Sequence, residues 1–143
     1  MTADRETPTA MCAPELPPRP GADVRLVIVG AGQINFGSPE GPWNHSFRLE
    51  HKLGPRLKVV ALIDPDAERA RRVLKTKCQS FVLSAYKDTV VYPTFKDYMA
   101  SVCAETYPHA VWVGSPPAFR GGTEPGRNLE QLLTAGLPNV PLF

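Results

Sequence analysis

The sequence of 143 residues has no long hydrophobic run and little net charge. No apolar segment approaches the roughly 20 residues that a membrane-spanning helix needs. The amino-terminal stretch lacks the charged region and apolar core of a secretory signal. The formal net charge of +2 is too small to favour binding to nucleic acid or to an anionic membrane. We therefore expect neither a nucleic-acid partner nor a membrane partner.

Cysteine is also scarce. Cys12, Cys78 and Cys103 are widely spaced and odd in number, and they form neither a disulfide framework nor a CxxC metal pattern. Cys103 is most simply a small buried hydrophobic residue on a helix. The cysteines therefore predict reduced thiols, a cytoplasmic location and no metal site.

The first informative stretch is VRLVIVGAGQINFG, which begins at Val24. Its apolar residues Val24–Val29 are rich in β-branched side chains, which is typical of a buried strand. Gly30 and Gly32 follow, and such a turn lets the backbone approach a pyrophosphate. A GxG pair alone fits an ordinary strand-to-helix connection as well. The interpretation of this turn therefore depends on the rest of the chain.

The third glycine of a GxGxxG pattern is missing, because Asn35 occupies its position. The glycine- and proline-rich insertion Phe36–Pro42 follows it. We therefore expect the first helix to start late and to run from about Trp43 to Leu53, with Gly54 as its end. The insertion is either neutral or a lid that sets specificity, and the sequence favours the neutral interpretation.

A second strand covers Lys58–Ile63 and ends at Asp64. Asp64 has two interpretations. It could cap the helix that follows, whose basic residues would form a solvated face. Alternatively, it could accept hydrogen bonds from the adenosine ribose, as an acidic residue does after the second strand of a βαβ unit. The second interpretation favours NAD over NADP, although Arg69 and Arg72 leave NADP open.

The remaining chain continues this alternation of strands and helices. Strands are predicted over Thr89–Tyr92, His109–Gly114 and Val140–Phe143, and helices over about Thr94–Glu105 and Arg127–Ala135. Five short apolar strands with helices between them predict an α/β fold, a doubly wound parallel sheet of the Rossmann type in a single domain. Residues 1–23, rich in proline, are expected to be a flexible leader before a domain that covers residues 24–143.

These segments resemble the amino-terminal domain of the glucose–fructose oxidoreductase, inositol dehydrogenase and rhizopine catabolism family. The matching pieces are VRLVIVGAGQI, KVVALIDPDAERA, VYPTFKDYM, HAVWVGSPP and NLEQLLTAGLPNVPLF. The long first insertion is similar to that of fungal members. The order and spacing of the pieces carry more weight than any single one.

The resemblance implies a domain that binds a nicotinamide dinucleotide, NAD or, as the alternative, NADP. Gly30, Ala31, Gly32, Gln33 and Ile34 match the pyrophosphate turn, and Asp64 matches the ribose acid. Ser115 and Pro116 match a threonine–proline pair beside the cofactor. The polar residue that often follows that proline is replaced by Pro117.

The resemblance also implies an oxidoreductase that transfers hydride on a sugar-like or other hydroxyl or carbonyl substrate. In the family, the strand matching Val140–Phe143 leads into a glutamate–lysine–proline motif and then a substrate domain, which this sequence lacks. We therefore assign no catalytic residue and expect the isolated chain to be inactive or to depend on a partner, either itself or a second chain. The alternative is a non-catalytic NAD(P)-binding module that regulates or binds a partner.

Overall fold

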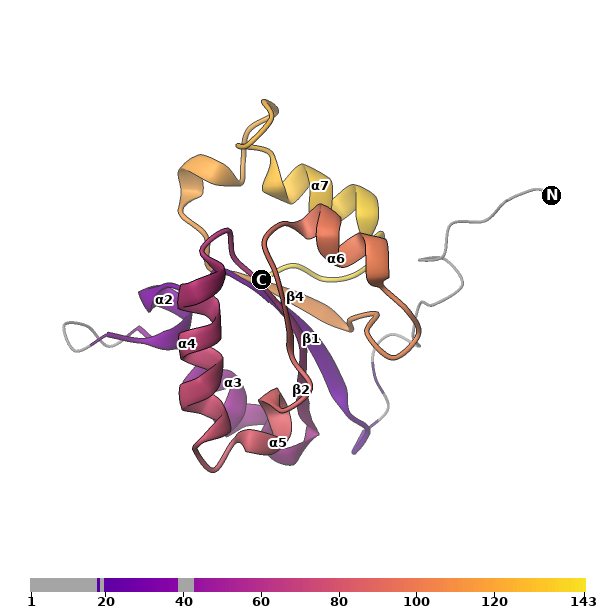
Figure 1. Ribbon diagram of the computed structural model, residues 1–143. Helices are drawn as coiled ribbons and strands as arrows, with labels where there is room; N and C mark the ends of the chain where they lie inside the picture. The colour runs from indigo at the N-terminus through magenta and orange to yellow at the C-terminus, as the bar shows by residue number, and fades with distance from the viewer. Residues whose placement is uncertain (1–17, 19, 39–42) are drawn as a thin grey trace.

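The computed structural model describes residues 18, 20–38 and 43–143 (Figure 1). Its central sheet contains the parallel strands β1 (Val24–Val29), β2 (Leu57–Ile63), β3 (Val90–Tyr92) and β4 (Ala110–Val113), in the order β3-β2-β1-β4. Beside β4, the predicted fifth strand is reduced to a parallel bridge between Val111 and Leu142 and the backbone hydrogen bonds around it. The leader predicted over residues 1–23 lies mostly outside the described residues.

Helices cover both faces of the sheet (Figure 1). One face packs against α3 (His45–Leu53), α4 (Ala67–Cys78) and α5 (Leu83–Tyr86), and the other against α6 (Phe95–Ser101) and α7 (Leu129–Gly136). Successive residues of β1 point to opposite faces and are buried on both, which explains why the strand is a continuous apolar run. The predicted doubly wound parallel sheet of the Rossmann type is therefore confirmed.

The connection after β1 differs from the prediction of one late helix. A short helix, α2 (Gln33–Phe36), begins directly after the glycine turn. The longer α3 begins at His45, because the side chain of Asn44 accepts a hydrogen bond from the Phe47 N–H at 3.0 Å and caps the helix. The helix predicted over about Trp43–Leu53, with Gly54 as its end, is therefore present as α3, but the prediction that it is the first helix was wrong because α2 precedes it. Residues 39–42 of the predicted insertion lie outside the described part of the chain.

The cap of α4 also differs from the prediction. Its side-chain cap is Asp66, whose Oδ1 accepts a hydrogen bond from the Arg69 N–H at 3.0 Å. Asp64 lies two residues earlier, at the end of β2, and does not cap the helix. The capping interpretation of Asp64 was therefore wrong, and its carboxylate serves other contacts.

One basic residue of α4 is buried against the helices beside it, contrary to the predicted solvated face. Lys77 donates to Glu50 of α3 at 2.5 Å, and both side chains are largely buried. Tyr86 of α5 also donates to Glu50, at 2.7 Å. Burial, and then the Glu50 carboxylate, raise the pKa of Tyr86, so its hydroxyl stays protonated. This cluster joins the three helices on one face of the sheet.

Helix α6 ends earlier than predicted. The Ser101 residue is its last, and Val102 turns into extended backbone with its side chain in the core. Cys103 is consequently exposed, and its thiol donates to the Glu105 carboxylate at 3.2 Å. The prediction of a buried Cys103 was wrong because the helix does not continue far enough to turn this residue inward.

The strand β4 is preceded by a buried histidine that makes stability depend on pH. The Nδ1 atom of His109 accepts a hydrogen bond from the Arg25 N–H at 2.8 Å. Burial, and then the charge of Arg25, lower the pKa of His109 below its usual 6.5. The folded protein therefore favours the neutral imidazole, whereas the unfolded chain takes up a proton as the pH falls below its ordinary pKa.

We expect the contribution of His109 to the free energy of unfolding to be complete above about pH 6.5. This contribution should be lost as the pH falls toward the lowered pKa of His109. Urea unfolding at about pH 7.5 and about pH 5.5 measures this loss. A His109→Gln variant, which keeps an acceptor and does not titrate, should lose less stability over that interval. An equal loss in both proteins would assign the pH dependence to other groups.

Candidate functional site

A cavity of about 1050 Å³ opens at the carboxyl ends of the strands. Its lining comes from the turn after β1, the ends of β2 and β4, and the first residues of α4, α6 and α7. Ligand pockets usually have volumes up to about 1000 Å³, so this cavity has the size for a dinucleotide. In open α/β sheets, ligands bind beyond the carboxyl ends of the strands, and the cavity has that position.

The two glycines of the turn serve different purposes. Gly30 has a φ of +103°, and a Cβ there would lie 3.2 Å from the carbonyl carbon of Gly114. Its N–H donates to the Ile63 carbonyl at 2.8 Å, which ties the turn to β2. Gly32 has nothing within 4 Å of a Cβ position and faces the cavity. Gly30 is therefore required by the fold, and Gly32 leaves open space at the cavity.

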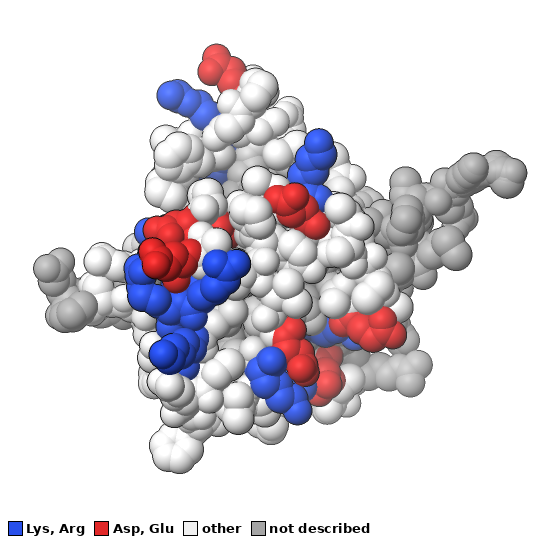
Figure 2. All heavy atoms as spheres, viewed as in Figure 1, with Lys and Arg blue, Asp and Glu red and all other residues white. Residues whose placement is uncertain are grey.

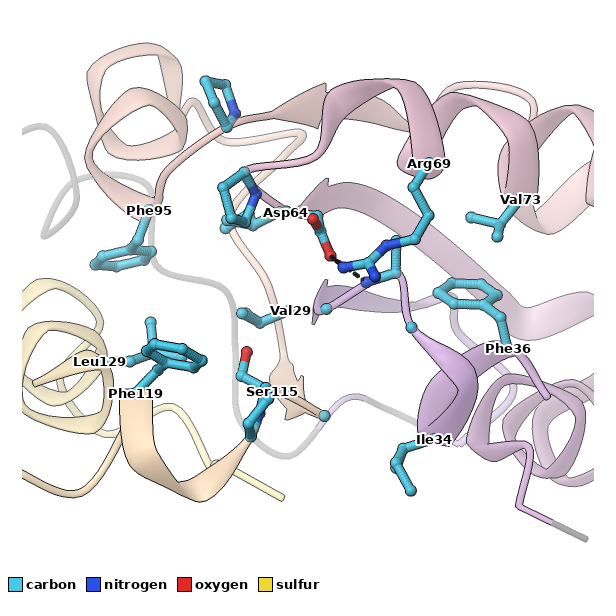
Figure 3. A pocket seen from close by; sticks show the side chains of 18 of the residues that line it. Val29, Ile34, Phe36, Asp64, Arg69, Val73, Phe95, Ser115, Phe119 and Leu129 are labelled. Atoms are coloured by element: carbon cyan, nitrogen blue, oxygen red, sulfur yellow. Dashed lines mark hydrogen bonds and ion pairs between the residues drawn. The ribbon is translucent and has the colours of Figure 1, made fainter. Parts of the chain in front are cut away.

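Asp64 is buried beneath the cavity and accepts hydrogen bonds from three donors of this chain. Its Oδ2 accepts a hydrogen bond from the Ala31 N–H at 2.7 Å, and Asp66 N–H donates to its Oδ1 at 2.7 Å. The guanidinium of Arg69 reaches down from α4 and pairs with the same Oδ2 at 2.8 Å (Figure 3). The carboxylate thus joins the glycine turn, the end of β2 and the first turn of α4.

Arg69, predicted to lie on the solvated face of its helix, is exposed but also makes a contact that the prediction did not include. Its side chain is 44% exposed, yet it lies over Asp64 and lines the cavity. Arg72, one turn further on, also lines the cavity and forms a loose pair with Glu68 at 3.8 Å. Figure 2 shows basic side chains gathered with acidic ones over α4. Arg69 therefore pairs with the carboxylate, and Arg72 adds a second guanidinium group to the lining of the same cavity.

All eight residues predicted for the cofactor site lie around this one cavity. Ser115 and Pro116 follow the end of β4, next to the glycine turn, and also line the cavity. The others come from the turn after β1 and the end of β2. The eight are Gly30, Ala31, Gly32, Gln33, Ile34, Asp64, Ser115 and Pro116. What they bind stays a prediction.

The sequence interpretation missed an apolar wall on the other side of the cavity. This wall lies across from Ile34 and consists of Phe95 of α6, Leu129 of α7 and Phe119, which precedes α7 (Figure 3). Leu132 of α7 is 47% exposed and also lines the cavity. No local pattern identifies these residues, because only the packing of α6 and α7 on the sheet brings them to the cavity.

The described ranges, 18, 20–38 and 43–143, contain no group of three or more His, Cys, Asp or Glu residues that could hold a metal ion. Within the same ranges, no helix combines the length and the apolar character required to cross a membrane.

Comparison with known proteins gives relatives of greater length. Two proteins of Schizosaccharomyces pombe, both described as uncharacterized, are 44% identical over 125 residues and 38% identical over 133 residues. These matches cover 86% and 91% of this chain, but only 33% of each relative. The chain therefore spans about a third of the length of these curated relatives.

A crystal structure of the WlbA dehydrogenase from Chromobacterium violaceum, in complex with NADH and UDP-GlcNAcA, matches with a TM-score of 0.45 and 18% identity. The match covers 73% of this chain and 24% of that one. The model of the GFO/IDH/MocA family, described as an oxidoreductase family with an NAD-binding Rossmann fold, matches residues 24–140. Since that match covers most of the sequence, the chain belongs to the GFO/IDH/MocA oxidoreductase family.

Proposed function

We propose that the cavity binds a nicotinamide dinucleotide and that the chain is the cofactor-binding domain of an oxidoreductase. The observation that carries the proposal is the position of Asp64, whose carboxylate lies at the end of β2 and contacts the glycine turn through the Ala31 N–H. An acid in that place accepts hydrogen bonds from the ribose hydroxyls of a dinucleotide, and the adjacent turn holds its pyrophosphate.

The turn has the space and the donors that a pyrophosphate requires. Gly32 places no atom between the backbone and the cavity. The first amides of α2 have no carbonyl partner within their own helix, because the first N–H groups of any helix lack one. Amides at such a position favour anionic groups. The Phe95, Phe119 and Leu129 wall supplies apolar surface for a base or a ring of the same ligand.

Binding of a ribose to Asp64 requires Arg69 to move, because the carboxylate is only 3% exposed and Arg69 lies over it. Three donors of the chain already use three of the about four acceptor positions of this carboxylate. Two of these donors are backbone groups of the turn and the helix. The half-exposed Arg69 is the one that can leave without disturbing either element. We therefore propose that the ribose hydroxyls replace Arg69 on Asp64.

An Asp64→Asn variant tests the proposal. Hydrogen bonds to a charged group contribute about 1.5–3 kcal/mol, so the Kd for NADH should rise at least about tenfold. Isothermal titration calorimetry of the wild type and the variant measures this. The matched control is Asp88→Asn, an exposed carboxylate between α5 and β3 that does not line the cavity.

The midpoint of thermal unfolding must be compared in the same samples, because Asp64 also supports the glycine turn. A weaker Kd in a variant that is still folded supports the ribose contact. If the wild type binds neither NADH nor NADPH, the cofactor proposal is wrong.

NADP is a second candidate cofactor, favoured by one observation. Arg69 and Arg72 both line the cavity beside Asp64, and arginine at this place accommodates a ribose 2′-phosphate. Once displaced from the carboxylate, Arg69 is free to pair with such a phosphate. The same calorimetric titration with NADPH distinguishes the two cofactors.

The hydride transfer itself is proposed for the longer protein that the relatives represent, with a sugar-like or other hydroxyl or carbonyl substrate. When bound, the nicotinamide supplies or accepts the hydride. The ionisable residues among those that line the cavity are Asp64, Arg69, Arg72 and Lys96. Asp64 is taken up by the turn, and we assign none of the four to proton transfer at the substrate.

Because none of these ionisable residues is assigned to proton transfer, a non-catalytic module that binds NAD(P) and regulates or binds a partner is the alternative function. A partner would then be a second copy of the chain or another polypeptide that contributes a substrate domain. Turnover of any hydroxyl substrate by this chain alone would contradict the alternative.

A further inference from the structure

The residue that replaces the third glycine of the turn is buried and bonded. Asn35 of α2 is 1% exposed, and its Nδ2 donates to the carbonyl of Gly30 at 2.8 Å and to that of Val29 at 3.1 Å. Val29 keeps a second donor, because the Gly114 N–H reaches its carbonyl at 2.8 Å. The contact with Gly30 is therefore the one that removal of Asn35 affects most.

That contact acts on one particular peptide unit. The Gly30 carbonyl and the Ala31 N–H belong to the same plane, since the peptide bond between them is rigid. Asn35 donates to the carbonyl end of this plane, and Asp64 accepts from the N–H end at 2.7 Å. The orientation of the peptide between Gly30 and Ala31, one residue before Gly32, is therefore fixed from both sides.

The space that the Asn35 side chain occupies lies beside Gly114, at the end of the neighbouring strand β4. A Cβ on Gly114 would lie 2.4–2.5 Å from the Nδ2, Cγ and Oδ1 atoms of Asn35, so the amide rests against the bare Cα of that glycine. The third glycine of a dinucleotide turn normally provides room for close packing of the helix. Here the room is provided by the partner, Gly114.

The two polar atoms of the Asn35 amide differ in their hydrogen bonding. Oδ1 is buried and has no hydrogen-bond partner in the described part of the structure. An unpaired buried acceptor lowers the stability of the fold, so we expect the hydrogen bonds donated by Nδ2 to offset this loss. This points to the hydrogen bond from Nδ2 to Gly30 as the reason for an asparagine here.

We propose that Asn35 is a positioning residue for the pyrophosphate turn and that it forms an obligatory pair with Gly114. The proposal rests on the cofactor function proposed above. In this pair, a side chain stands where the turn normally has a glycine, and the glycine at the end of β4 provides the space for it.

A double-mutant cycle on thermal unfolding tests the pair. Gly114→Ala overpacks the site and should lower the unfolding midpoint by about 5 °C. The same alanine in an Asn35→Gly background should cost less than about half of that, because the colliding amide is gone. An equal cost in both backgrounds would overturn the proposed pair. This measurement requires no cofactor, so it remains informative if the chain binds none.

The positioning role has its own readout in the choice of ligand. Asn35→Ala should raise the Kd for NADH and for ADP about tenfold, because both ligands place phosphates on the turn. Adenosine has no phosphate, and its Kd, measured by ligand-observed NMR, should not change. A uniform loss for all three ligands, or no loss for any, would contradict a role at the pyrophosphate turn. Failure of the wild type to bind NADH would instead overturn the proposed function.

Discussion

A Lys77→Met variant is expected to lose about 3 kcal/mol of the free energy of unfolding, the cost of breaking a buried ion pair by removing one partner. Methionine is unbranched and keeps most of the length of the side chain, but it lacks the ammonium group. The variant leaves the Glu50 carboxylate with the Tyr86 hydroxyl alone, in a place where its side chain is 8% exposed. Urea unfolding followed by circular dichroism measures the loss.

The physical reason for this large effect is the asymmetry of the pair. Glu50 is fixed among three helices, whereas Lys77, at 15% exposure, lies closer to water. The rings of Phe36 and Tyr86 also lie near its ammonium group, at 6.0 and 5.6 Å. A Glu50→Gln variant should therefore cost less than Lys77→Met, because the lysine left behind can turn toward solvent.

A double variant, Lys77→Met with Glu50→Leu, provides the control. Replacing both charged partners by apolar groups of similar size is often neutral, so the double variant should be more stable than Lys77→Met alone. If the double variant is the less stable protein, the loss in Lys77→Met comes from packing and not from the unpaired carboxylate.

The second large effect is expected for Gly30→Ala. A residue with a side chain at a φ of +103° is strained, and its Cβ would press on the backbone of Gly114 at 3.2 Å. Strain of this kind costs about 1–3 kcal/mol, and the neighbouring backbone has little freedom to yield. We therefore expect Gly30→Ala to lower the free energy of unfolding by about 3 kcal/mol and to abolish measurable binding of NADH.

Gly32→Ala is the matched control, because it adds the same methyl group two residues later. Gly32 has a φ of −84°, which alanine adopts without strain, and its Cβ would contact nothing within 4 Å. Stability should stay close to that of the wild type, whereas the Kd for NADH should rise, since the methyl group enters the space proposed for the pyrophosphate. Equal stability losses in the two variants would show that the turn tolerates no side chain at either glycine.

Much of the fold is predictable because its signals are local. The apolar run Val24–Val29 and the apolar residues before Asp64 can be buried on both faces only in the middle of a layered sheet. Their alternation with helical segments then leaves the parallel, doubly wound arrangement as the consistent topology. Gly30 follows from the same logic, because a sharp turn must come between the strand and the helix.

Helix ends and side-chain partners were harder to predict. Asp64 and Asp66 are both good capping residues, and local sequence does not show which of them the helix uses. Arg69 and Lys77 have the pattern of a solvated helix face. The ion pair of Arg69 and the burial of Lys77 depend on Asp64 and Glu50, which lie outside this helix.

By itself, the sequence determined the class of fold and the glycine turn, since both rest on composition and spacing along the chain. The family resemblance of the sequence implied the eight residues that lie around one cavity. Only the tertiary structure decided the partners. It placed Arg69 on Asp64, brought Phe95 and Phe119 to the apolar wall, and set Asn35 against Gly114. These contacts join residues from separate elements, and their geometry exists only once the helices pack on the sheet.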